Sequence, residues 1–247
     1  MKYIKILMLT IVMLHQNNIS QSIKPLLLPT TLTEKNIVQI LKQAKHGEYN
    51  NFEMIRKIAE RKNDVIPILS RILKYKEPIV IKIDSIPVEN DSVHTLISLK
   101  LYSIYILEVI GTPDVLNILS QSISFQQDDN VRGAIVNVFA HSYYERTIVA
   151  QPKTLPNKET IKLLLQFADD TSMVERFQKS IGKIAREGLL RWTEKDLGAV
   201  VNGKPIIIKI GTNKIEMTPK QYRDWWWKTY HSKLTWNSEK NLFYIKH

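Results

Sequence analysis

Four basic side chains between positions 176 and 186 recur at steps of three and four, a spacing at which they could bind an anion together. They are Arg176, Lys179, Lys183 and Arg186. On a single helix they would share one side, opposite the apolar residues, and such a side can receive phosphates or carboxylates. The alternative is a solvated helix face, on which Glu175 pairs with Lys179 and Lys183 pairs with Glu187.

Two pairs of adjacent aspartates, Asp128-Asp129 and Asp169-Asp170, could serve as a general acid and a general base. Both pairs stand at equivalent turns in front of apolar segments, so helix capping is the favoured interpretation. His141 ends one of these segments, and a structural role is favoured over a ligand role.

Three consecutive tryptophans occupy positions 225–227, and they cannot all point inwards because each helical step turns by about 100°. We expect one inward-facing group, made of Tyr222, Trp225, Trp226 and Tyr230. Trp227 should face another way, towards Trp236 or the nearby strands. An exposed Trp227 would be a further candidate for partner binding.

Common catalytic patterns are missing from the sequence. The chain has no cysteine, hence no thiol nucleophile. It has no His-Glu-x-x-His pattern, no Gly-x-Ser-x-Gly elbow and no Gly-Lys-Ser/Thr phosphate loop. We therefore predict no catalytic residue, no metal ligand and no bound cofactor.

The elements that must position these side chains are repeated. Residues 64–73 and 114–123 have closely similar sequences, and residues 159–167 form a looser third copy. A period of roughly 45–50 residues is typical of helical pairs that stack on one another. Such pairs cannot bury their apolar faces alone, so the stack offers an extended surface rather than a deep pocket.

The middle of the chain resembles a HEAT repeat. The resemblance rests on residues 107–119, where Gly111 ends one helix and Pro113-Asp114 opens the next, and on residues 128–140, where an acidic turn precedes Val131-Arg132. It extends loosely over residues 34–193. The later copy departs from the pattern, because Glu175 stands where the repeat has arginine.

The C-terminal part resembles the closing segment of exported bacterial HEAT-repeat proteins, which ends in a Trp-rich helix. Residues 190–198, 225–227 and 234–236 carry this resemblance, although the strand-like insert between them is longer than expected. The resemblances together imply an all-α, HEAT-like α-solenoid with a small β-containing, Trp-rich C-terminal cap.

Three segments follow along the chain. Residues 1–22 combine a basic start, a short apolar run and small residues at 20 and 22, the layout of a signal peptide. The alternative is an ordinary buried helix. Residues 23–195 should form the helical repeats, and residues 196–247 the cap. The apolar run is too short to span a membrane, and without cysteine we expect no lipid anchor.

The sequence also predicts individual elements. Thr33 should cap a first helix that ends at Gly47, and Asp64 should cap a third. Residues 79–83 have the composition of a strand, and the most apolar helix should end near Ile110. Short strands are expected over 201–217, with a helix opening at Pro219.

The predicted core includes Leu69, Leu107, Leu119, Val138 and Leu164. At the C-terminal end, Trp225 or Trp226 should cover the last repeat, near Ile184, Leu189 and Trp192.

The net charge of +11 favours an acidic partner, although scattered lysines also keep a surface soluble. Together these features suggest a non-enzymatic extracytoplasmic binding or scaffold protein, periplasmic or secreted. Its curved face would hold a protein or another acidic macromolecule, and nucleic acid is disfavoured if the chain is exported. The alternative is a basic HEAT-like enzyme or nucleic-acid-processing protein, of the glycosylase or lyase kind.

Overall fold

The computed structural model describes residues 26–45, 50–75, 92–140, 156–195, 197, 205–210 and 212–246. These residues are mostly helical, with small antiparallel sheets. The helices are α2 (Glu34–Lys45), α3 (Asn51–Glu60), α4 (Lys62–Lys74), α5 (Ser92–Ile110), α6 (Pro113–Ser122), α7 (Asp129–Ala140), α8 (Lys158–Phe167), α9 (Ile181–Thr193) and α10 (Pro219–Tyr230). The strands are β1 (Met173–Val174), β2 (Lys179–Ser180), β3 (Ile206–Ile210), β4 (Asn213–Met217), β5 (Leu234–Asn237) and β6 (Leu242–Ile245).

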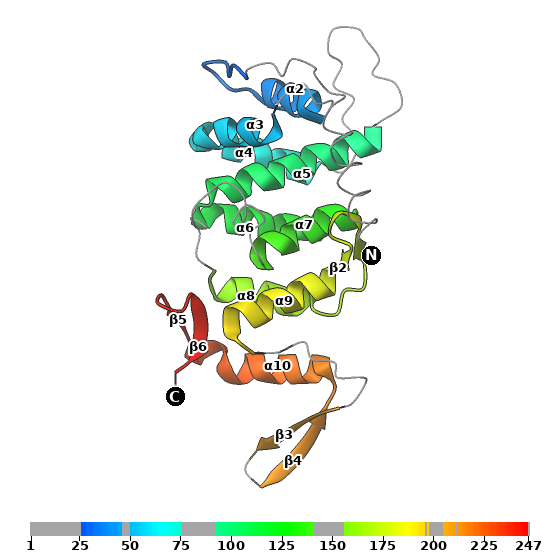
Figure 1. The fold of residues 1–247 in the computed structure, drawn as a ribbon, viewed down its shortest axis with the longest axis vertical. Helices are drawn as coiled ribbons and strands as arrows, with labels where there is room; N and C mark the ends of the chain where they lie inside the picture. The colour runs from blue at the N-terminus through cyan, green and yellow to red at the C-terminus, as the bar shows by residue number, and fades with distance from the viewer. Residues whose placement is uncertain are drawn as a thin grey trace, which may run out of the picture.

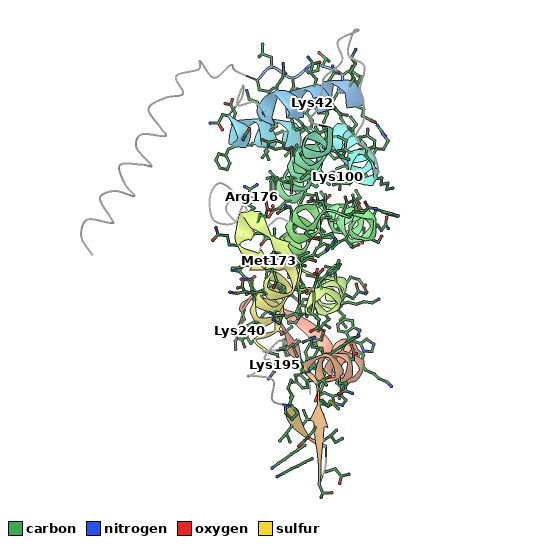
Figure 2. All side chains as sticks on the ribbon, turned by 90° about the vertical axis from the view of Figure 1, so that its right-hand side faces the viewer. Lys42, Lys100, Met173, Arg176, Lys195 and Lys240 are labelled. Atoms are coloured by element: carbon green, nitrogen blue, oxygen red, sulfur yellow. The ribbon has the colours of Figure 1, made fainter. Side chains whose placement is uncertain are left out.

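The helices follow one another along the long axis of the molecule, from α2 at one end to α10 at the other (Figure 1). They form two rows, which Figure 2 shows nearly end-on. Helices α5, α7 and α9 contact one another in sequence along one row, and α4 contacts α6 in the other. Each helix therefore packs mainly on its neighbours in the stack.

Local sequence signals explain several helix ends. The Thr33 hydroxyl accepts a hydrogen bond from the Asn36 amide at 3.2 Å, which confirms the predicted cap. The Asp128 carboxylate accepts one from the Val131 amide at 2.9 Å. Gly111 ends α5 with a φ of 59°, a left-handed conformation that glycine adopts without strain.

The predicted cap of the third helix is wrong by three positions. Helix α4 begins at Lys62, so Asp64 lies inside its first turn. Its carboxylate instead forms an ion pair with Arg61 at 2.6 Å. The carboxylate still lies near the positive end of the helix dipole, where negative charge is favourable.

The core confirms four of the five predicted positions. Leu69, Leu107, Leu119 and Leu164 are fully buried, whereas Val138 is only half-buried. Val138 still packs against the core, but the neighbours of α7 leave part of its side chain exposed.

Helix α5 is the central element, as predicted from its apolar composition. It contacts α2, α3, α4, α6 and α7. It also buries Lys100, whose ammonium donates to Gln126 Oε1 at 2.8 Å. The Gln126 amide donates to the Leu73 carbonyl at 2.7 Å, so this small network joins α5 to the end of α4. Burial lowers the pKa of Lys100, and the nearby Asp128 carboxylate opposes that effect.

The C-terminal segment contains the predicted strands and the helix opening at Pro219. It also contains a hairpin that the sequence did not predict, in which β5 pairs with β6. Trp226, Leu234 and Phe243 are buried and belong to the same continuous core as α9. The predicted signal peptide, Gly47, the 79–83 strand and His141 lie outside the described residues.

Candidate functional site

The four basic residues do not share one helix face. Helix α9 begins only at Ile181, after Ser180 accepts a hydrogen bond from the Lys183 amide at 3.2 Å. Arg176 and Lys179 precede this cap and belong to a short hairpin formed by β1, a 3-10 turn and β2. The helical spacing that motivated the prediction is therefore a coincidence in this segment.

Residues 173–180 form a hairpin because α7 provides a matching surface. A Cβ atom at Gly133 would lie 2.1 Å from Val174 Cγ2, so only glycine lets β1 approach α7 this closely. Asn130 accepts a hydrogen bond from the Glu175 amide at 3.0 Å. Gln178 adopts the left-handed conformation at φ 50° and reverses the chain. These contacts fix the position of Arg176.

Arg176 lies on the side of the α5–α7–α9 row (Figure 2) and contacts α5 through Tyr105. Its guanidinium donates to the Tyr105 hydroxyl at 2.6 Å and lies over the ring, 4.9 Å from the centroid. Tyr105 itself is buried. A cation–π contact of this kind holds the guanidinium in one orientation.

A cleft of about 420 Å³ opens beside this arginine. We name it the Arg176 cleft; it is lined by Ile97, Leu101, Tyr105, Asn130, Ala134, Val174, Glu175, Arg176 and Phe177. Its walls are mainly apolar, with charged and amide groups contributed by the hairpin and α7. An apolar cleft with a few fixed polar groups is the usual form of a binding site.

The other basic residues have local partners or face solvent. The Lys179 ammonium pairs with Glu187 at 2.8 Å, eight positions away, rather than with Glu175. Arg186 donates to the Ala168 carbonyl at 2.6 Å. Lys183 is exposed on α9. Arg176 is therefore the member of the predicted set that lines a cleft.

Nearby Tyr102, on the same helix as Tyr105, has a shifted pKa. Burial raises the pKa of its hydroxyl, while a hydrogen bond with Asn51 and the charge of Arg176 oppose the shift. The hydroxyl is therefore neutral at physiological pH.

A second, larger cleft of about 630 Å³ lies beside α10, where the end of α9 meets β3, β5 and β6. We name it the aromatic cleft. Its walls include Tyr222, Trp225, Trp226, Tyr230, Phe243 and Tyr244, with Lys195 and Lys209 among the polar residues. Trp225 stacks on Tyr222 with a centroid separation of 5.9 Å, and the Tyr230 ring meets it edge-on at 5.7 Å.

Trp227 faces away from this cleft. Its indole is half-buried and packs against the His231 ring, with a centroid distance of 5.5 Å. The sequence had suggested a contact with Trp236 or the nearby strands instead. Trp236 packs instead against Phe243, at a centroid distance of 5.1 Å. The cross-strand pairing of β5 with β6 brings these two rings together.

The second aspartate pair does not cap a helix. Asp170 accepts a hydrogen bond from the Ser172 amide at 2.9 Å, which stabilises the turn after α8. The Asp169 carboxylate pairs with Arg223 of α10. The capping interpretation holds for Asp128 but is wrong for Asp169 and Asp170, because the chain after them forms the β1–β2 hairpin and the next helix begins only at Ile181.

Sequence reasoning missed Tyr105, Asn130 and Gly133, which build the Arg176 cleft. The sequence carries weak signals for them: Tyr105 brings a hydroxyl into an apolar helix, and Gly133 interrupts a helical pattern. Nothing in the spacing links them to Arg176, because the contacts span up to 71 positions.

The described residues contain no group of three or more side chains that could hold a metal ion. Among the same residues, no helix has both the length and the apolar character needed to cross a membrane. Comparisons with protein-family models, with curated proteins and with solved structures found no match.

Proposed function

We propose that this chain is a non-enzymatic, exported binding or scaffold protein, in which a HEAT-like stack of helical pairs holds an acidic segment of a macromolecular partner. The Arg176 cleft would be the contact site. A carboxylate of the partner would pair with the guanidinium, and a neighbouring apolar side chain would enter the cleft.

The observation that carries this proposal is the fixed position of Arg176 beside an apolar cleft. Tyr105 orients the guanidinium through a hydrogen bond of 2.6 Å and a ring contact. An oriented guanidinium loses little conformational freedom on binding, and its planar fork suits a carboxylate. Lysine at this position would lack the planar fork.

The repeat-like arrangement supports the same proposal. The three similar sequence segments form helices α4, α6 and α8, and each of these helices is followed by a helix of the α5–α7–α9 row. In stacks of this kind, extended surfaces rather than enclosed pockets serve as binding sites. The net charge of +11 would steer an acidic partner towards such a surface.

Site-specific photo-cross-linking in cells tests the proposal. We would place a photoreactive amino acid at Leu101, inside the Arg176 cleft, and at Lys62, exposed on α4, as the positional control. The expected result is a discrete adduct from position 101 only. Arg176→Ala should abolish it, and Arg176→Lys should weaken it.

Lys183→Ala is the matched control, because Lys183 is an exposed basic residue outside the cleft. It should leave the adduct unchanged. An equal loss of the adduct in the Arg176 and Lys183 variants would mean that binding depends on the overall positive charge and not on the Arg176 cleft. Absence of an adduct at position 101 would argue against the site altogether. Amino-terminal sequencing of exported material, expected to begin near Ile23, tests export separately.

The aromatic cleft favours a second candidate function, the binding of single-stranded nucleic acid. Aromatic side chains beside lysines bind such strands by stacking on the bases and pairing with phosphates. Here Trp225 and Tyr222 offer the rings, and Lys195 and Lys209 offer the charges. Residues 205–210 and 212–246 carry eight lysines and arginines against three acidic residues.

An oligonucleotide titration followed by tryptophan fluorescence tests this second candidate. Binding should fall steeply between 50 and 200 mM salt, by about tenfold or more, if several phosphates are contacted. Trp225→Ala should weaken it, while Trp227→Ala, whose ring faces away from the cleft, serves as the control. Absence of binding at low salt would exclude this candidate and leave the first.

A further inference from the structure

The β3–β4 hairpin is largely exposed, and it projects beyond α10 at the end of the stack (Figure 1). Asn213, Lys214, Ile215 and Glu216 are all exposed along β4. Among the described residues, the only strand that pairs with β4 is β3. Its outer edge therefore presents unpaired backbone amides and carbonyls to solvent.

A two-stranded hairpin of this kind is marginally stable by itself, because stable sheets generally need a third strand or a covering surface. One of its faces is apolar, since the register pairs Ile206 with Met217 and Ile208 with Ile215. Ile215 is 37% exposed on that face. More strands added at the β4 edge would extend this face and bury part of it.

The register shows which groups point outwards from β4. Ile210 is paired with Asn213, so two residues connect the strands. The pair that closes such a loop exchanges hydrogen bonds, and hydrogen-bonded pairs alternate along an antiparallel ladder. The amides and carbonyls of Lys214 and Glu216 consequently point away from β3, towards the free edge.

We propose that this edge binds a second copy of the chain, so that the two β4 strands pair antiparallel about a two-fold axis at Ile215. This arrangement places Lys214 opposite Glu216 of the second copy, and Glu216 opposite its Lys214. The outward-pointing backbone groups of these residues then form the hydrogen bonds of the new ladder. The result is a four-stranded sheet with one continuous apolar face.

The charges select this register. The nearest registers that keep the outward-pointing groups paired are shifted by two residues. They place Lys214 opposite Lys214, or Glu216 opposite Glu216, and like charges directly opposite one another are destabilising. A lysine on an exposed edge normally discourages pairing. Here Glu216 of the second copy lies opposite Lys214 and neutralises its charge. The edge therefore accepts an identical strand, and it disfavours strands that place no acidic residue opposite Lys214.

The other edge of the hairpin lacks this self-complementarity. A symmetric pair of β3 strands about Ile208 would place Lys209 opposite Ile207. Pairing of β3 with β4 would leave edges free at both ends and would continue into a fibre. The β4 edge is therefore the one that allows a closed dimer.

Sedimentation equilibrium of the full chain tests the proposal, with charge exchange as the decisive comparison. The wild type should form a dimer. Lys214→Glu and Glu216→Lys each place like charges opposite one another, and each should weaken dimerisation by about tenfold or more. The double variant restores opposite charges and should dimerise within about threefold of the wild type.

Both positions are exposed, so the variants should fold normally, and circular dichroism with thermal melting verifies this. Lys220→Glu, an exposed charge reversal on α10, is the matched control and should leave the dimer intact. A monomeric wild type would overturn the proposal. Single variants that dimerise normally, or a double variant that stays monomeric, would overturn the pairing at β4.

Discussion

The guanidinium of Arg223 on α10 forms an ion pair with Asp169, a residue 54 positions earlier in the turn after α8. Arg223 is almost completely buried, with 2% of its side chain exposed, whereas the Asp169 side chain is 55% exposed. The guanidinium also donates to the Leu197 carbonyl at 3.3 Å. This contact joins α10 to the turn that follows α8.

The asymmetry of this pair predicts unequal mutational effects. Asp169→Ala leaves a buried cation without its carboxylate and should lower the free energy of unfolding by about 2–4 kcal/mol. Arg223→Met leaves a carboxylate that water can solvate, and should cost less. The double variant should be more stable than Asp169→Ala alone. Urea unfolding of the four proteins measures this cycle, and equal single effects would contradict the asymmetry.

Leu107 lies at the centre of the stack, so its truncation should be costly. Leu107 is fully buried on α5, and Leu107→Ala should lower the free energy of unfolding by about 2–5 kcal/mol. The matched control is Leu190→Ala, because Leu190 is 50% exposed on α9. It should change stability by less than about 0.5 kcal/mol. Similar losses in both variants would mean that α5 is not the central element.

The C-terminal segment covers the end of the stack, so its removal should expose apolar surface. Trp226, Leu234 and Phe243 are buried in the core that includes α9. We expect a chain without residues 219–247 to aggregate or to melt at a clearly lower temperature. Light scattering and thermal melting measure this. A monomeric truncated chain with unchanged melting would mean that the segment is not a structural cap.

Lys100 predicts a pH dependence with a defined sign. Burial lowers its folded pKa below the usual 10.5, so the folded chain binds fewer protons than the unfolded chain between these two values. Stability contributed by this site therefore rises with pH through that window. The stability difference between wild type and Lys100→Met should shift in favour of the wild type as pH approaches 10.5.

Tyr102 provides the opposite sign on the same helix. Its folded pKa is raised above 10.0, so the folded chain retains the proton longer than the unfolded chain. Stability from this site should therefore fall as pH rises above 10.0, and Tyr102→Phe removes that fall.

Denaturant melts over this pH range measure both the Lys100 effect and the Tyr102 effect. Parallel stability curves for wild type and Lys100→Met would contradict the assignment for Lys100.

Gly133 provides a test of the hairpin that carries Arg176. A methyl group at this position would clash with Val174, so Gly133→Ala should cost about 1–3 kcal/mol. Val174→Ala creates space, and the two substitutions together should cost less than the sum of their separate effects. Thermal melting of the cycle measures this coupling. Strict additivity would mean that β1 does not pack on α7 as described.

Elements whose apolar residues recur at helical spacing could be predicted from the sequence. This was sufficient for α5, for the helix after Asp128 and for the helix opening at Pro219, since each also has a local capping signal. It failed for residues 173–180, where a helical spacing of basic residues coincides with a hairpin. The docking of that hairpin on Gly133 overrides the local pattern, because it buries Val174.

The sequence by itself determined the helical character, the aspartate cap before α7, the glycine at the end of α5 and most of the core, since these depend on residues a few positions apart. The tertiary structure alone decided the site. Arg176 meets Tyr105 across 71 positions, and Arg223 meets Asp169 across 54. Such contacts depend on how the rows of helices pack, and packing is a property of the whole chain that no local spacing specifies.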